Sequence, residues 1–370
     1  PPSTPSSAAS DVYKRQIRDV PIALAKREFN VTVLTPAYGS FTGLPGATRL
    51  KSLQVEFEGT QQAFDLYELP DHATAAGVRH IVVDHPLFSS GGAGRIYCSD
   101  LPDRPFATDA SKFALLCACT AESIVEAVLG KIDVIHLHDW HSAFLLILSR
   151  YDTRYQALKD IHCAYTIHNL SIQGIRPFAE DDSSLETWYP DLSYEPERLA
   201  DPRWTDCVNP MALAIRLADR VHAVSPSYAE EILSPSDIDE RGFHGGEGLE
   251  ADLRDAHEQG RLFGILNGCE YPQTKKSGSG GWKALLGKMR QQVPLWAGAS
   301  KTPDKTHTIA LSRLNQLDND RPGMILTSVG RITGQKIGLM IQPTSDAVSY
   351  THLTLPTIVR ECRSRWSPYH

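Results

Sequence analysis

The chain has 370 residues, of which 41% are hydrophobic and 22% charged, and its formal net charge is −7. This length and balance predict a globular protein of about two domains, and no apolar run is long enough to cross a membrane. A mildly acidic chain matches nucleic acid poorly, so we expect neither nucleic acid nor a membrane as a partner. The seven cysteines are scattered without a zinc-type spacing, so we expect reduced thiols, a cytoplasmic location and no metal.

Apolar strand-like runs alternate with helical patterns along the chain. Helices are predicted over 20–28, 109–129, 209–218 and 228–233, and strands over 31–36, 81–84, 133–138, 162–168 and 220–224. Asp109 is the expected N-cap of the longest helix, and Gly130 is its expected stop. Strands that alternate with helices predict βαβ units and a parallel sheet, which is an α/β fold.

The composition changes after residue 268. A stretch rich in Ser, Gly and Lys over 273–305 predicts a linker. A helix near 308–317 and a strand over 324–329 then begin a second α/β domain. The predicted organisation is a first domain over 17–268, a linker region over 269–322 and the start of a second domain over 323–342.

The two ends, residues 1–16 and 343–370, do not fit this organisation. If residues 6–16 are back-translated with suitable codons, the reverse complement of that DNA encodes residues 348–357. The string resembles a transposon-type adapter from sequencing libraries. We therefore expect both ends to be translated adapter and out-of-frame flank, and the native protein to extend beyond them. A native low-complexity tail is the alternative.

Polar residues gather where the predicted strand 133–138 ends. His136, His138, Asp139 and His141 lie at or just beyond its carboxyl end, which is where open α/β sheets bind ligands. Asp139 could accept hydrogen bonds from sugar hydroxyls. Metal ligands and core histidines are alternatives that the local pattern leaves open.

Asparagines follow other predicted strands. The strand 162–168 ends at His168 and Asn169, and a histidine there can act as an acid or base, bind a ligand or be structural. Asn209 precedes a proline and is typical of a helix N-cap. Asn267 lies at a strand end beside the predicted linker.

Two further motifs carry glycines or charge. Residues 242–249 are rich in glycine, but they do not follow a strand with the spacing of a dinucleotide loop, so alone they are a weak signal. Arg331 and Lys336 lie across a predicted strand–helix turn, where both could reach a diphosphate and stabilise a leaving group. A basic surface turn is the alternative.

The order and spacing of these motifs resemble the bacterial glycogen and starch synthases. The matching blocks are VPIALAKREFNVTVLTPAY (20–38), DVIHLHDWH (133–141), TIHNLSIQG (166–174), VNPMALAIRLADRVHAVSPSYAEEI (208–232), GGEGLEADLRDAHEQGRLFGILNGC (245–269) and VGRITGQK (329–336). The NPM…VSPSYAEEI and EGL…GILNG blocks are the most specific. The resemblance spans residues 17–342.

This resemblance implies a GT-B architecture, in which two Rossmann-like domains face a cleft, with the second domain largely missing here. It implies retaining transfer of glucose from ADP-glucose, or UDP-glucose as in some relatives, to the non-reducing end of glycogen or another α-1,4-glucan. It also implies that the reaction needs no cofactor and no metal.

The site residues follow from the same resemblance. His168 resembles the histidine beside the transferred glucose, where it would stabilise an oxocarbenium ion. Arg331 and Lys336 resemble the pair that neutralises the departing diphosphate. The residues expected to bind substrate are Asp139, Asn169, Asn267, Tyr97 and Asn209.

The chain departs from the family at its ends. The family's Lys-x-Gly-Gly-Leu phosphate loop would lie just before residue 17, and the glutamate and nucleotide pocket of its second domain are absent. We therefore expect the chain as written to be inactive and its complete parent to be active. The alternatives are another GT-B glycosyltransferase and a non-catalytic glucan-binding remnant. A Rossmann oxidoreductase is disfavoured, because no G-x-G-x-x-G follows a strand.

Overall fold

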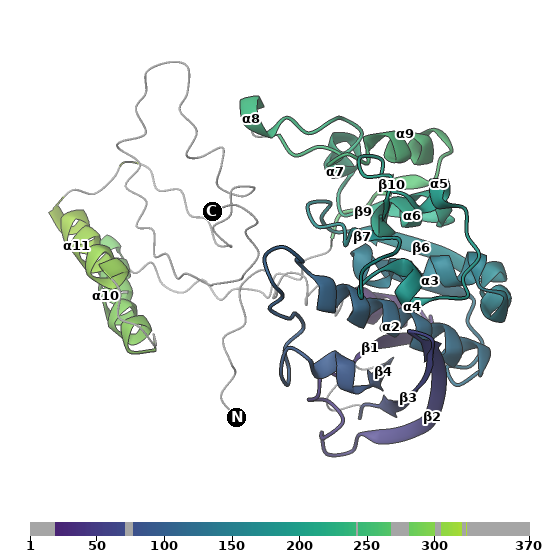
Figure 1. Cartoon of the computed structure of the whole chain (residues 1–370). Coiled ribbons are helices and arrows are strands. Elements are labelled where there is room, and N and C mark those ends of the chain that lie inside the picture. The colour runs from purple at the N-terminus through teal and green to yellow at the C-terminus, as the bar shows by residue number, and fades with distance from the viewer. Residues whose placement is uncertain are drawn as a thin grey trace. The chain divides into compact units, whose positions relative to one another are not determined.

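The computed structural model describes residues 19–70, 77–241, 243–267, 281–299, 305–319 and 323. The chain divides into two compact units, of which the larger is Gln16–Gly268 (Figure 1). The described part of the other unit is the helix pair α10 (Trp282–Ala299) and α11 (Lys305–Asn319). No described helix is long and apolar enough to span a membrane.

The larger unit begins with a mixed four-stranded sheet. Its strands are β1 (Val31–Pro36), β2 (Thr48–Phe57), β3 (Thr60–Glu68) and β4 (Val78–Asp84). They lie in the order β1-β4-β3-β2, in which β1 and β4 are parallel and the other two pairs are antiparallel. Strands β1 and β4 confirm the predictions over 31–36 and 81–84.

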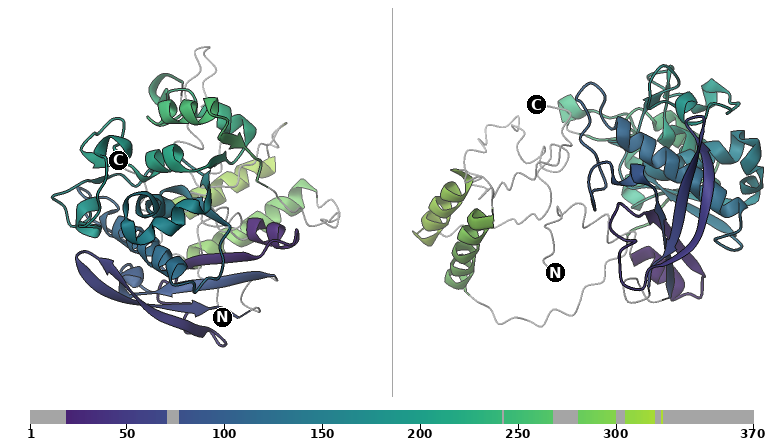
Figure 2. Two further views of the ribbon diagram at one scale, coloured as in Figure 1. Left: turned by 90° about the vertical axis from the view of Figure 1, so that its right-hand side faces the viewer. Right: turned by 60° about the horizontal axis from the view of Figure 1, so that its bottom comes forward.

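The β2–β3 hairpin was not predicted from the sequence. Figure 2 shows it as a long curved ribbon at one side of the unit. Its two-residue turn, Glu58 and Gly59, has φ angles of 53° and 66°, which suit the twist of a hairpin. Along β2 the buried Leu53, Val55 and Phe57 alternate with less buried residues, the period of a half-buried strand. The turn lacks the Asn-Gly or Asp-Gly signal, which is why the pattern was missed.

The second sheet is entirely parallel. Its strands are β5 (Val134–His138), β6 (His162–Ile167), β9 (Arg220–Ala223) and β10 (Leu262–Gly264). They lie in the order β10-β9-β6-β5, and each neighbouring pair is parallel. This sheet confirms the predicted parallel strands over 133–138, 162–168 and 220–224.

Helices connect the strands. The longer ones are α2 (Ala107–Val125), α3 (Asp139–Tyr151), α6 (Pro210–Leu217), α7 (Pro226–Glu231) and α9 (Glu250–Glu258). Short elements are the 3-10 helices Pro86–Ser89 and Thr153–Asp160, the helices α4 (Leu185–Trp188), α5 (Pro196–Leu199) and α8 (Ile238–Arg241), and the antiparallel pair β7 (Arg176–Pro177) and β8 (Cys207–Val208). Residues 19–25 are also helical.

The prediction that Asp109 caps the long helix is wrong. Helix α2 begins earlier, after Phe106, whose φ is 62°. The carboxylate of Asp109 is fully buried and accepts hydrogen bonds from the backbone N–H of Cys98 and from the ammonium of Lys112. Asp109 therefore serves the preceding loop and not the N–H groups of its own helix.

Two other local predictions had opposite outcomes. Asn209 caps α6, since its Oδ1 accepts from the N–H groups of Met211 and Ala212 at 2.9 and 3.0 Å. The linker prediction over 273–305 is wrong where α10 forms, because the Ser- and Gly-rich composition ends near residue 281. Helix α11 confirms the helix predicted near 308–317, and it packs on α10 through Leu286, Val293, Ala310 and Leu314.

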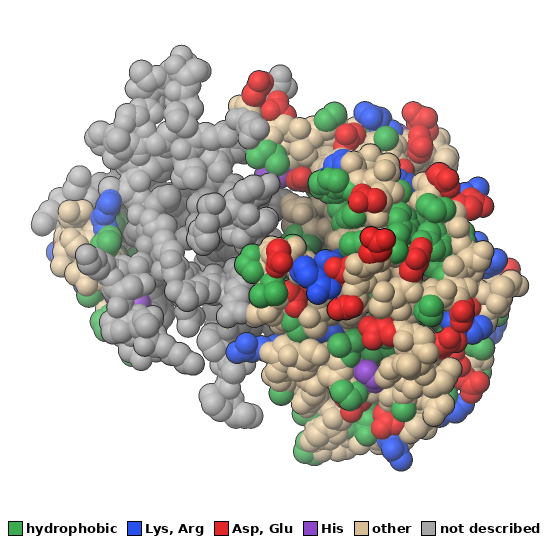
Figure 3. Space-filling view, in the orientation of Figure 1, with side chains coloured by type: hydrophobic (Ala, Val, Ile, Leu, Met, Phe, Trp, Pro, Cys, Tyr) green, Lys and Arg blue, Asp and Glu red, His purple; other side chains and the backbone are tan. Residues whose placement is uncertain are grey.

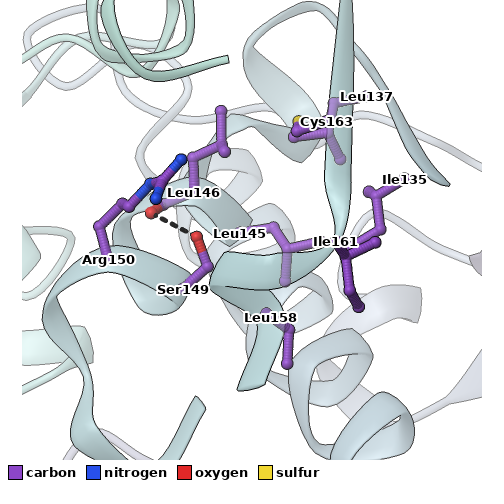
Figure 4. A pocket seen from close by; sticks show the side chains of 9 residues that line it. All are labelled: Ile135, Leu137, Leu145, Leu146, Ser149, Arg150, Leu158, Ile161 and Cys163. Carbon is purple, nitrogen blue, oxygen red and sulfur yellow. Dashed lines mark hydrogen bonds between the residues drawn. The ribbon is translucent and has the colours of Figure 1, made fainter. Parts of the chain in front are cut away.

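One face of the parallel sheet packs tightly against α3. Ile135 and Leu137 of β5 and Cys163 of β6 point toward Leu145 and Leu158 (Figure 4). The side chains there enclose a void of about 10 Å³, which holds one water at most. Because side chains alternate along a strand, His136 and His138 lie on the opposite face of this sheet.

Candidate functional site

The parallel sheet brings two histidines together at its carboxyl edge. His138 ends β5 and His168 directly follows β6, and their Nδ1 and Nε2 atoms are 3.0 Å apart. One ring must donate and the other accept, which fixes the orientation of both. Burial, followed by the charges of His222 and His136, lowers the pKa of His168 to about 4. The His168 ring is therefore neutral near pH 7.

Asp139 joins the start of α3, directly after β5, to the loop that follows β6. It adopts a φ of 50° at the junction of β5 and α3, and its Oδ1 accepts a hydrogen bond of 2.8 Å from the backbone N–H of His168. Burial raises the pKa of Asp139 to about 7, although the backbone N–H groups of His168 and Asn169 oppose that shift. Asp139 is 6% exposed. Its hydrogen bond to the backbone of His168 holds the loop after β6 in place.

Tyr97 lies beside the start of α3. Its hydroxyl is 3.0 Å from Nε2 of His141, and the His141 ring stacks on Trp140 with centroids 4.4 Å apart. Trp140 in turn lies against Gly174, where an added Cβ would be 2.4 Å from the indole and where φ is +70°. Burial, ahead of the charges of neighbouring groups, lowers the pKa of His141 to about 3. The His141 ring in this contact is therefore neutral near pH 7.

A second chain of hydrogen bonds crosses the same face of the sheet. The hydroxyl of Thr166 is 2.7 Å from Nε2 of His136 and 2.9 Å from Nδ1 of His222. The other nitrogen of His222 lies 3.1 Å from the carbonyl oxygen of Ile265. This chain ties the segment that carries Asn267, which is half-buried, to the strands of the site.

The remaining predicted residues have different surroundings. Asn209 is fully buried, and its Nδ2 donates to Asp201 and Gln173 at 2.6 and 2.7 Å. This leaves it no exposed surface for a substrate in the structure. Arg331 and Lys336, and the strand predicted over 324–329, lie outside the described residues. In the part of the chain that is described, no group of three or more His, Cys, Asp or Glu side chains could hold a metal ion.

Sequence comparison places these residues in a family. The model of the starch synthase catalytic domain matches residues 15–255, which include the ends of β5, β6 and β9. The chain belongs to the starch synthase catalytic domain family.

Individual relatives agree with this family. A glycogen synthase of Paracoccus denitrificans is 28% identical over 333 residues, covering 87% of this chain and 59% of its own length. A glycogen synthase of Koribacter versatilis is 31% identical over 257 residues, covering 69% and 48%. One from Streptococcus equi subsp. equi is 35% identical over 164 residues, covering 44% and 31%. The chain thus spans a third to three fifths of the length of these synthases.

A solved structure shares the fold. The catalytic domain of starch synthase IV from Arabidopsis thaliana, bound to ADP and acarbose, aligns with a TM-score of 0.56 and 23% identity, over 85% of this chain and 64% of its own. This likeness confirms the α/β fold class that the alternation of strands and helices in the sequence predicted.

Some polar residues of this family member were not singled out in the sequence. Thr166 and His222 are examples, and so is Tyr228, whose hydroxyl accepts from the backbone N–H of Leu170 at 3.3 Å. Their positions depend on the register of β6 against β9, in which Thr166 pairs with His222. An alignment of the predicted strands could have found His222, because it lies within β9 at the position that pairs with Thr166 of β6.

Proposed function

We propose that this chain carries part of the active site of a glycogen or starch synthase, a glycosyltransferase. The reaction is retaining transfer of glucose from ADP-glucose, or UDP-glucose, to the non-reducing end of an α-1,4-glucan. The observation that supports it most is the family match across the residues that build the His138–Asp139–His168 edge. No metal or cofactor takes part in the proposed reaction.

The geometry gives each residue of this edge a role. His138 orients the ring of His168, and Asp139 holds its backbone, so the imidazole is fixed before substrate arrives. A neutral ring can hydrogen-bond a sugar hydroxyl without adding positive charge beside an oxocarbenium ion. Asn169, which follows His168 in the chain, and Tyr97, whose hydroxyl contacts His141, would bind further hydroxyls. Asn267 would lie near the donor sugar.

The diphosphate of the donor requires positive charge. We assign that role to Arg331 and Lys336, which would neutralise the charge that develops as the nucleotide leaves. Asn209 would support the site without touching substrate, because it caps α6 and donates a hydrogen bond to Gln173 in the loop after β6.

We also propose a cytoplasmic location, without nucleic acid or membrane partners. The five described cysteines are free thiols, as expected in a reducing compartment. Acidic and basic side chains are interspersed over the face of the larger unit that Figure 3 shows.

The test is transfer of radiolabelled glucose from ADP-glucose and UDP-glucose to glycogen, by this chain and by the full-length gene product. We expect transfer by the full-length protein, and a fall of roughly a hundredfold or more in kcat for His168→Ala and Lys336→Ala. His162→Ala is the matched control, because His162 begins β6 at the opposite edge of the sheet. A well-folded full-length protein that uses neither donor would refute the proposal and favour a glucan-binding remnant.

A further inference from the structure

The glycine-rich segment 243–249 forms a fixed loop beside α7. A Cβ added to Gly245 would lie 2.1 Å from the carbonyl oxygen of Ser234, and one on Gly246 would lie 2.7 Å from that of Ile232. The backbone N–H groups of Gly245 and Glu247 both donate to the hydroxyl of Ser236, at 3.0 and 3.2 Å. The glycines therefore allow close packing, and Ser236 holds the loop in one conformation.

Gln173 ties this loop to the one that follows His168. Its Nε2 donates to the carbonyl oxygens of Leu170 and Glu247, both at 3.0 Å. Its Oε1 accepts from Arg203 and Asn209 at 2.8 and 2.7 Å. The Gln173 amide is 6% exposed and fully hydrogen-bonded, so it acts as a rigid bridge between the two loops.

Tyr228 is a second sign that the glycine-rich loop lies near the loop after His168. Its hydroxyl accepts from the N–H of Leu170, and after burial the largest influences that raise its pKa include the carboxylates of Asp139 and Glu247. One hydroxyl thus lies within electrostatic reach of both the strand-end aspartate and the glycine-rich loop. The loop borders the candidate site.

The loop presents a polar pair to solvent at this border. Nδ1 of His244 is 2.8 Å from Oε1 of Glu247, and the two side chains are 25% and 19% exposed. Within the described residues, Nε2 of His244 and Oε2 of Glu247 make no other hydrogen bond. Glu247 adopts a φ of 51°, a conformation that costs a non-glycine residue energy and is common at binding sites.

We propose that His244 and Glu247 bind hydroxyl groups of the glucan acceptor. The carboxylate accepts from one sugar hydroxyl and the imidazole hydrogen-bonds a neighbouring one. A neutral glucan fits this pair, whereas the diphosphate of a sugar nucleotide would be repelled by the carboxylate. The inference rests on the proposed function, since it assumes that the ligand of the site is a glucan.

The test measures binding of maltoheptaose to this chain by isothermal titration calorimetry. We expect Glu247→Gln and His244→Gln each to weaken binding roughly tenfold, the usual effect of losing a hydrogen bond to a charged or strongly polar group. In the full-length protein, the affinity for ADP should not fall in either variant. Circular dichroism of each variant should match that of the unsubstituted chain.

Two matched controls lie away from the site. His162→Gln changes a histidine whose Nδ1 is 3.5 Å from Asp219, at the amino edge of the sheet. Glu195→Gln changes an exposed glutamate paired with Arg198 at 2.6 Å. Both should bind maltoheptaose as the unsubstituted chain does.

Three results would overturn the inference: unchanged glucan affinity in folded Glu247→Gln and His244→Gln, a loss of ADP affinity in place of glucan affinity in the full-length variants, or no glucan binding by the unsubstituted chain. The proposed function is decided separately by glucose transfer in the full-length protein. If the full-length protein transfers glucose but the variants bind glucan as tightly as the unsubstituted chain, the synthase proposal stands. His244 and Glu247 are then not part of the acceptor site.

Discussion

The two sheets of the larger unit place polar side chains differently. In β1-β4-β3-β2 the strand directions are mixed, and a pair such as Arg79 and Glu68, 2.9 Å apart, joins neighbouring strands at the surface. In β10-β9-β6-β5 all strands run the same way, so the residues that follow them meet at one edge, as His138 and His168 do. Strand direction, more than composition, decides where a site forms. Four predictions test this contrast.

The largest effect is expected at Asp139, where burial raises the pKa to about 7. Between about pH 4 and pH 7 the folded state keeps a proton that the unfolded state has lost, so stability falls as the pH rises. The unfolding free energy of the unsubstituted chain, relative to Asp139→Asn, should fall by roughly 3 kcal/mol across this range. Urea denaturation at pH 4.5 and pH 7.5 measures it.

Asp181 is a control of opposite sign. Burial alone would raise the pKa of Asp181, but hydrogen bonds from Arg104 and from the backbone N–H of Ser183 lower it overall. Asp181 therefore adds to the free energy of unfolding at a pH above its unfolded pKa, and this stabilisation is lost as the pH falls below about 4. Equal pH slopes in the chain and in Asp139→Asn would contradict the first prediction.

The second largest loss of stability is expected where Asn209 hydrogen-bonds Asp201 and Gln173. Asn209→Asp keeps the oxygen that caps α6, but it replaces the Nδ2 donor with an oxygen that faces Asp201 at 2.6 Å. Two buried carboxylates in contact should lower the unfolding free energy by about 3 kcal/mol at pH 7. Urea denaturation measures this loss. The loss should shrink as the pH falls, because protonation of either carboxylate removes the contact between two like charges.

The third prediction concerns the strand-end histidines. His138→Ala removes the hydrogen bond that orients His168, so kcat/KM of the full-length protein should fall roughly a hundredfold, equivalent to about 2.7 kcal/mol. His138→Asn, whose side chain can still hydrogen-bond His168, should recover part of the loss. Equal activity of His138→Ala and the unsubstituted protein would show that His168 needs no such partner.

The smallest effect is expected in the mixed sheet. Arg79→Gln breaks the half-exposed ion pair with Glu68, which should change the unfolding free energy by no more than about 0.5 kcal/mol and leave transfer unchanged. Thermal unfolding and the transfer assay check both. A loss of activity here would break the contrast between the two sheets.

Sequence patterns predicted the parallel strands better than the contacts between them. The residues that end or follow neighbouring parallel strands lie at one edge of the sheet, and there the backbone N–H of His168 donates to Asp139. The roles of Asp139, His168 and Asn169 in substrate binding or catalysis stay predictions. The bridge from His136 through Thr166 to His222 was not predicted, since it depends on the register of three strands.

Other features were missed for physical reasons. The burial of Asp109 beside Lys112 depends on how a distant loop packs on α2, and the Glu58–Gly59 turn lacks the usual residues. The roles of Arg331 and Lys336 remain predictions, because both lie outside the described residues.

The close approach of Gly174 to Trp140 has a genetic consequence. Every single-base missense change of a glycine codon introduces an amino acid with a Cβ, and a Cβ at residue 174 overlaps the indole. Each such allele must displace Trp140 and the stacked His141 ring, or strain a backbone at φ +70°. No missense change of this codon is therefore neutral, and a deep mutational scan should find that residue 174 tolerates no substitution.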